Sequence, residues 1–339
     1  MHDMSDLKET FNLYSQLSNV SQGVSLADLE CAKRWIQVAE EYEHTTTILA
    51  YQTFLCFSVQ HFTTLLSLPQ HLALLKELVA STAIDAFSAC LRHGNPPNAV
   101  ELLEQGHGVF WSQLIRLCSP LDKVIASGDM GMKLADRLIE SAPLLRSVLG
   151  TPPTAESQYD WACRLNIQLQ DIVTEIHKLP GLLHFLLPPL FSDLQIAASS
   201  RPVIVINASQ YSCDAPIVLL DRDPVHIALP ITKPRISELS MNFRALMSRA
   251  RFSDMTRELL VFLRELWDTV VLPIVSTLQE FCPHQSRIWW CPTAEFSLLP
   301  LHAAGLFRKG QPMLPDLYIS SYIYAHVDSP HSHSSKKTI

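Results

Sequence analysis

The chain has 339 residues, of which 47% are hydrophobic and 17% charged, and its formal net charge is −7. Most of the negative charge lies in residues 1–150 and neither half is basic, so the release of counterions that drives nucleic-acid binding is missing and no nucleic-acid partner is expected. With only 10 glycines, collagen-like and glycine-linker chains are excluded and glycine-rich phosphate loops are disfavoured.

Residues 1–200 are expected to be helical almost throughout, because apolar side chains recur at three- and four-residue steps. The segment Gly94-Asn95-Pro96-Pro97 separates two of these helices and predicts an αα-hairpin. Helices are predicted over residues 26–43, 46–67, 70–77, 79–93, 98–117, 130–149 and 155–179. Small side chains stand at positions suited to close helix approach, namely Ala50, Ala83, Ala86 and Ala99. Such hairpins in series resemble degenerate tetratricopeptide repeats, although no strict period is present, and a non-repetitive helical bundle is the alternative.

From about residue 200 the pattern changes to short Val- and Ile-rich runs that alternate with helical segments, which predicts an α/β sheet domain over residues 201–322. Strands are predicted over residues 202–207, 215–220, 225–229, 287–291 and 317–322. Helices are predicted over residues 234–251 and 259–274, with Pro273 as a kink or as the entry to a further helix. The predicted fold is therefore α plus α/β, followed by a polar tail at residues 323–339 that we expect to be disordered.

The eight cysteines are scattered singly with no C-x-x-C pair, so neither a zinc ribbon nor a disulfide framework is expected. Residues 1–11 lack the apolar core of a secretory signal. The most apolar segment, Leu179 to Phe191, is short and interrupted by prolines, so we expect no membrane span and a cytoplasmic protein.

The segment RIWWCPTAEFSLLPLHAAGL at residues 287–306 closely resembles the signature of CHAT domains, caspase-like α/β domains that follow tetratricopeptide repeats, especially in their fungal forms. The predicted strands at residues 202–207 and 317–322 fit the same domain, and residues 99–117 resemble the last helical repeats of those proteins. Two residues depart from the family pattern: His107 replaces a more usual arginine, and Ala294 replaces a glycine in the turn. The signature residues, for which a structural role is expected, are Trp289, Trp290, Cys291, Pro292, Pro300, Leu301, His302, Ala303, Ala304 and Gly305.

The resemblance implies kinship with caspases and separases, in which a histidine deprotonates a cysteine whose thiolate attacks a peptide carbonyl. In CHAT domains both catalytic elements follow the strand that matches residues 318–322. Here the polar tail follows instead, so no residue matches the catalytic histidine or cysteine, and no cofactor or metal is expected.

Other candidate groups carry a structural interpretation beside the chemical one. Cys291 and His302 suggest a Cys/His pair but belong to a predicted core unit. Cys282 and His284 are expected at the surface of a loop. The remaining candidates are strand-end aspartates more typical of turns (Asp214, Asp221, Asp223), tail histidines that could bind metal weakly (His326, His331, His333), a G-x-G inside a helix (Gly106, Gly108) and an apolar stripe typical of a core (Phe110, Trp111, Leu114).

Together these features predict an interaction protein that binds a protein or peptide partner in the groove of its helical repeats, without peptidase activity. One alternative is an incomplete gene model or fragment of a caspase-like cysteine peptidase. Another is a helical scaffold whose α/β part is vestigial.

Overall fold

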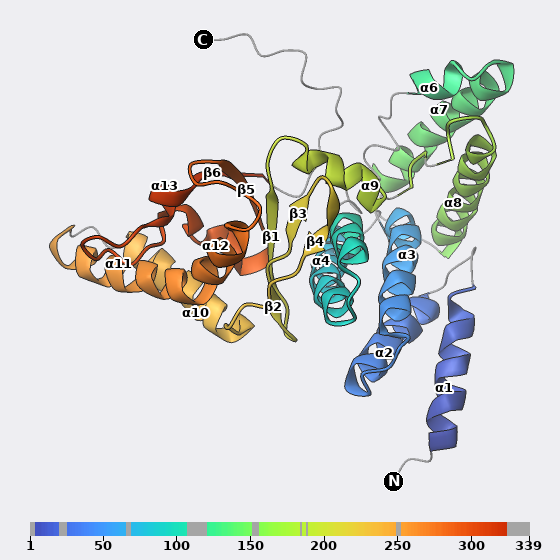
Figure 1. Ribbon diagram of the computed structural model, residues 1–339. Helices are drawn as coiled ribbons and strands as arrows, with labels where there is room; N and C mark the ends of the chain where they lie inside the picture. The colour runs from blue at the N-terminus through green and yellow to red at the C-terminus, as the bar shows by residue number, and fades with distance from the viewer. Residues whose placement is uncertain are drawn as a thin grey trace. The chain divides into compact units, whose positions relative to one another are not determined.

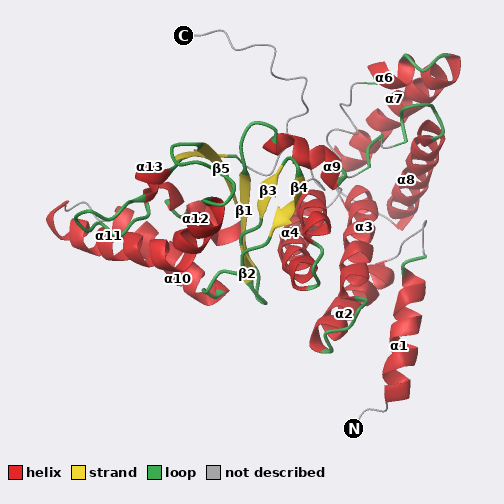
Figure 2. Cartoon of the chain, in the orientation of Figure 1, coloured by secondary structure: helices red, strands yellow, loops and turns green. Residues whose placement is uncertain are grey.

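The computed structural model describes residues 4–19, 26–65, 69–106, 121–150, 156–183, 185–187, 189–248 and 252–323. The chain is rich in helix, with a helical N-terminal region and a C-terminal mixed sheet of six strands (Figures 1 and 2). It divides into two compact units. The first comprises Met1–Ala86 and Leu102–Pro189, and the second comprises Phe87–Glu101 and Leu190–Ile339, so residues 87–101 belong to the unit that contains the sheet.

The first unit begins with α1 (Met4–Leu17), α2 (Leu26–Glu41) and α3 (Thr47–Leu65). Helices α2 and α3 match the helices predicted at residues 26–43 and 46–67 and pack against each other, and Trp35 and Phe54 of this pair are fully buried. The buried Tyr51 hydroxyl donates a hydrogen bond to Glu40 Oε1 at 2.8 Å, so this polar side chain is satisfied inside the packed face.

The prediction of two helices at residues 70–77 and 79–93 is wrong, because one continuous helix, α4 (Pro69–Arg92), covers both ranges. Leu78, which lies between them, is a good helix former and does not interrupt the helix. The predicted break after it is confirmed: Gly94 has φ +70°, and the chain is helical again over residues 96–106. Within the first unit, a Cβ added to Gly106 would lie 2.1 Å from Ala83 Cβ, so a residue without a side chain is needed where these two helices meet. The remainder of the predicted helix, residues 107–117, lies outside the described residues.

Three further helices of the first unit are α6 (Asp122–Ile125), α7 (Asp129–Gly150) and α8 (Glu156–His177). They surround a separate apolar cluster of buried side chains: Val124, Leu134, Ala135, Leu138, Ile172, Ile176 and Leu182. Helices α7 and α8 match the predicted ranges closely.

The second unit contains strands β1 (Val203–Ala208), β2 (Cys213–Asp214), β3 (Ile217–Leu219), β4 (Arg222–Val225), β5 (Arg287–Pro292) and β6 (Ile319–Tyr322). The strand order is β4-β3-β1-β5-β6, and β2 also pairs with β1. Strands β1, β5 and β6 are parallel to one another, whereas β2, β3 and β4 run antiparallel to their neighbours. The strand predicted at residues 225–229 is wrong in position, because the turn at Leu220 and Asp221 brings residues 222–225 against β3 and leaves Ala228 with only an isolated bridge to Asp214.

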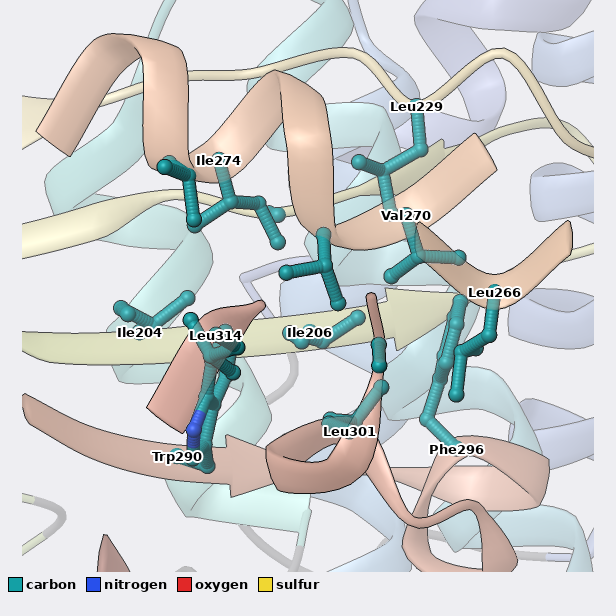
Figure 3. Packing of buried hydrophobic residues seen from close by; sticks show 14 of the residues in the cluster. Ile204, Ile206, Leu229, Leu266, Val270, Ile274, Trp290, Phe296, Leu301 and Leu314 are labelled. Atoms are coloured by element: carbon teal, nitrogen blue, oxygen red, sulfur yellow. The ribbon is translucent and has the colours of Figure 1, made fainter. Parts of the chain in front are cut away.

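The crossover from β1 to β5 passes through α10 (Lys233–Ser248), α11 (Phe252–Leu266), a π-helical turn (Trp267–Val271) and α12 (Leu272–Leu278). Pro273 lies in the first turn of α12, where its missing N–H is tolerated. Of the two roles predicted for it, a kink or the entry to a further helix, the structure has the second. Figure 3 shows the side chains of this crossover packed on Ile204, Ile206 and Trp290 of the sheet.

Every residue of β1 is buried, so both faces of the central strand are covered. Ile204 and Ile206 point into the cluster with α10 to α12. By alternation, Val203, Val205 and Asn207 point to the opposite face, and there Asn207 Nδ2 donates a hydrogen bond to Ser88 Oγ of α4 at 3.2 Å. Ser88, in the part of α4 that belongs to this unit, therefore lies against the second face of the sheet.

Candidate functional site

The first part of the signature forms strand β5. Trp290 is fully buried among the crossover helices, and its indole Nε1 donates a hydrogen bond to Ser320 Oγ of β6 at 3.0 Å. Cys291 pairs in register with Val205 of β1 and is 5% exposed. Since neighbouring residues of a strand face opposite sides, Cys291 lies on the face of the sheet opposite to Trp290. Trp289 is half-buried, and Pro292 is buried at the end of the strand.

The second part of the signature folds into two short 3₁₀ helices, Ala294–Leu298 and Leu301–Ala303. Leu301 and Ala304 are fully buried in the same cluster as Trp290. Gly305 lies so close to Met313 that an added Cβ would approach its side chain to 2.7 Å. Pro300 and Ala303 are half-buried. Most of these residues therefore fill a core.

The turn between the two parts contains backbone strain. Ala294, where the resemblance leads to the expectation of a glycine, has φ +47°. Only glycine adopts this left-handed region without a steric penalty, which for other residues is about 1–2 kcal/mol. The departure noted in the sequence thus falls at a position whose conformation favours glycine.

Cys291 and His302 do not form a Cys/His pair. The His302 backbone N–H donates a hydrogen bond to the Tyr322 hydroxyl at 3.1 Å, and His302 Nδ1 lies 3.0 Å from the same oxygen. Leu301, beside His302, packs on the Trp290 side of the sheet, whereas Cys291 faces the other side. A histidine that activates a thiol must lie within hydrogen-bond reach of it, and this arrangement does not provide that contact.

A network of polar side chains in the second unit surrounds Asp214 of β2, which is 1% exposed. Its Oδ2 accepts hydrogen bonds from Ser88 of α4 at 2.9 Å and from Ser212 at 2.6 Å. Its Oδ1 lies 2.8 Å from His226 Nε2, and the His226 side chain is 31% exposed. The prediction that Asp214 is a turn former is therefore wrong: the carboxylate is buried and satisfied by three side chains from different segments.

A second group of polar side chains continues this network to the end of β5. Thr293 Oγ1 donates to Asn207 Oδ1 at 2.7 Å, and Asn207 donates in turn to Ser88. The network thus lies where the parallel strands β1 and β5 end, at the edge where α/β sheets commonly bind ligands. Ser88 and Asn207 are fully buried, so they hold the helix to the sheet and present no reactive group to solvent.

The remaining candidates have separate surroundings. Asp221 forms an exposed ion pair with Arg222 at 2.9 Å, and Asp223 is exposed. His284 is exposed, as expected. The prediction that Cys282 lies at the surface is wrong, because its side chain is 8% exposed and belongs to the core cluster. Its backbone carbonyl accepts a hydrogen bond from the hydroxyl of Tyr318, which lies just before β6. Gly108, Phe110, Trp111, Leu114, His107, His326, His331 and His333 lie outside the described residues.

Burial controls the ionisation of two thiols in the second unit. Burial raises the pKa of Cys213 to about 12, and the nearby Asp214 and Glu295 carboxylates raise it further. Burial likewise raises the pKa of Cys90 to about 12, with Glu101 adding to the shift. Neither thiol is therefore activated as a nucleophile, because the thiolate is the reactive form.

A groove lies between α10 and α11, with a cavity volume of about 390 Å³. Its floor is apolar and consists of Leu239, Leu246 and Phe262. Arg235 of α10 donates to Glu265 of α11 at 2.7 Å and so bridges the two walls. Sequence reasoning did not single out this groove, and the signal in the sequence was the strong amphipathic pattern of α11.

Sequence reasoning also missed Ser88, Asn207, Thr293 and His226. A serine inside a helix and an asparagine at a strand end give no local signal of a shared network. Ser88 and its partner Asp214, for example, are more than a hundred residues apart in the chain.

Among the described residues, no three His, Cys, Asp or Glu side chains are grouped so that they could hold a metal ion. None of the described helices is long and apolar enough to cross a membrane. Comparison with protein-family models finds no match, and neither does comparison with curated proteins.

Proposed function

We propose that the chain is a CHAT-type protein-interaction module whose helical region binds an amphipathic helix of a partner protein. The observation that carries the proposal is a second apolar stripe on α7. Leu134 and Leu138 of this helix are buried in its own cluster, whereas Met132 and Ile139 are 50% and 51% exposed. Residues two helical turns apart lie on one line of a helix surface, so Met132 and Ile139 form one stripe beside the buried face, with the exposed Asp136 between them.

An amphipathic helix is the partner that fits this stripe. Apolar side chains on such a helix recur at the same one- and two-turn spacings, and a methionine adapts its shape to different apolar anchors. The buried alanines of the hairpins, including Ala50 and Ala83, support close helix packing of the kind found in repeat arrays.

The test is a selection of displayed peptides on the full chain, followed by binding measurements with the enriched peptides. Met132→Glu and Ile139→Glu are expected to weaken binding about tenfold or more, because each places a charge in an apolar contact. Lys133→Glu is the matched control, since Lys133 is exposed on the same helix outside the stripe. Failure to enrich any peptide, or equal losses in all three variants, would contradict the proposal.

The proposal includes the absence of peptidase activity. Its support is the burial of Cys291 in the sheet and the engagement of His302 with Tyr322. Incubation with a covalent cysteine-protease probe is expected to give no labelling of Cys291. Labelling that is lost in Cys291→Ala would overturn this part of the proposal while leaving the binding test intact.

A further inference from the structure

The groove between α10 and α11 combines an apolar floor with a charge that has no partner among the described residues. Leu246 and Phe262 are almost fully buried at its base, and Val261 on its wall is 57% exposed. The volume of about 390 Å³ lies near the lower end of the range for ligand sites, about 300–1,000 Å³. It is large enough for one or two side chains of a peptide.

The charged residues of the groove are not equivalent. Arg235 is neutralised by Glu238 and Glu265, and its bridge to Glu265 joins the walls. Glu258 also lines the groove, and it takes part in an interaction of its own. Arg257 lines the groove as well and is exposed, but among the described residues it forms no ion pair or hydrogen bond. A cation beside an apolar depression is complementary to a carboxylate next to an apolar side chain.

We propose that this groove is a second binding site, separate from the stripe on α7, for a short acidic peptide segment of a partner protein. An apolar side chain of the peptide contacts Val261 and enters above Leu246 and Phe262, and an adjacent Asp or Glu pairs with Arg257. The net charge of −7 repels most acidic ligands, so Arg257 also selects where such a peptide binds.

The experiment uses the full chain and two fluorescent peptides of the same leucine pattern, one with glutamates between the leucines and one with lysines. Anisotropy titrations are expected to show that the glutamate peptide binds about tenfold more tightly than the lysine peptide. Arg257→Glu is expected to reverse this preference, because a glutamate at this position repels the glutamate peptide and attracts the lysine peptide.

Arg244→Glu is the matched control. Arg244 is exposed on α10 and does not line the groove, and its replacement by glutamate makes the same change in charge as Arg257→Glu. The preference for the glutamate peptide is therefore expected to remain in this variant. Val261→Asp keeps Arg257 but places a carboxylate on the wall, and it is expected to weaken the glutamate peptide about tenfold.

Three outcomes would overturn the proposal: no binding of the glutamate peptide, equal binding of both peptides, or equal effects of Arg257→Glu and Arg244→Glu. Circular dichroism of each variant checks that the helices are retained. The exposed position of Arg257, without an internal partner among the described residues, makes loss of folding unexpected. Met132→Glu leaves this site unchanged, so it separates failure here from failure of the proposed function.

Discussion

The Glu101 carboxylate accepts a hydrogen bond from the backbone N–H of Phe191 at 2.6 Å, across 90 residues of chain. The chain leaves the second unit after Glu101 and enters it again at Leu190. Because these two points are in contact, residues 102–189 form an insertion whose ends lie together within that unit. The cost of closing a loop rises only slowly with its length, so such an insertion is compatible with a stable sheet unit.

A chain of residues 87–101 joined by a short Gly-Ser linker to residues 190–323 is therefore expected to fold by itself. Its urea unfolding is expected to be a single cooperative transition, followed by far-UV circular dichroism. Residues 190–323 alone are the comparison, and they are expected to bind the dye ANS because one face of the sheet is uncovered. Identical behaviour of the two fragments would show that residues 87–101 are dispensable.

Loss of the Asp214 carboxylate is expected to destabilise the second unit strongly. Asp214→Ala leaves Ser88 and His226 without their partner and is expected to lower the free energy of unfolding by about 3 kcal/mol. Ser88→Ala removes one of the three donors and is expected to cost about 1–2 kcal/mol. Asp223→Ala, at an exposed position, is the control and is expected to change stability by less than about 0.5 kcal/mol. Urea titrations measure all three, and a neutral Asp214→Ala would contradict the role of the network.

These polar contacts also mark the limit of what the sequence predicts. The strands at residues 203–208 and 287–292 were predicted almost to the residue, because buried parallel strands appear as continuous apolar runs. Strand β4, with the sequence Arg222-Asp223-Pro224-Val225, has no such run, and its position depends on pairing with β3. The cover supplied by residues 87–101 depends on contacts between distant segments, which no local pattern encodes.

The candidate site was less predictable than the fold. Several of the residues singled out in the sequence at 289–305 are buried, among them Trp290, Leu301 and Ala304. To predict the groove between α10 and α11, the distance between the two helices would have to be known. To predict the burial of Asp214, the position of Ser88 would have to be known. Both are properties of packing and not of residue order.

Replacement of Ala294 by glycine is expected to stabilise the protein. Ala294 has φ +47°, and removal of its Cβ relieves a steric penalty that exceeds the added entropy of the unfolded chain. We expect a gain of about 0.5–1 kcal/mol in urea unfolding. Ala245→Gly in the exposed part of α10 is the control, and the opposite sign is expected there, with a loss of about 0.5–1 kcal/mol. A loss at both positions would mean that the turn is not strained.

Stability is expected to fall at alkaline pH because of two buried thiols. Burial raises the pKa of Cys90 and Cys213 to about 12, whereas a cysteine thiol in the unfolded chain has its ordinary pKa of about 9.0. Between these values the folded state holds more protons than the unfolded state, so the free energy of unfolding decreases as pH rises. Each thiol contributes a slope of up to about 1.4 kcal/mol per pH unit.

Urea titrations under reducing conditions at pH values on both sides of 9 measure this slope. Cys213→Ala is expected to remove its share, and Cys31→Ala, at an exposed site, is expected to change nothing. An unchanged slope in Cys213→Ala would contradict the assignment.

The two outer strands of the sheet differ in a way that bears on association at high concentration. Strand β4 at one edge carries Arg222, Asp223 and Pro224, and charges and proline discourage the addition of another strand. Strand β6, the other edge among the described strands, has the sequence Ile319-Ser320-Ser321-Tyr322 and carries neither. Self-association during concentration or refolding is therefore expected to begin at β6, and a lysine at Ile319, which is 46% exposed, is the change best placed to suppress it.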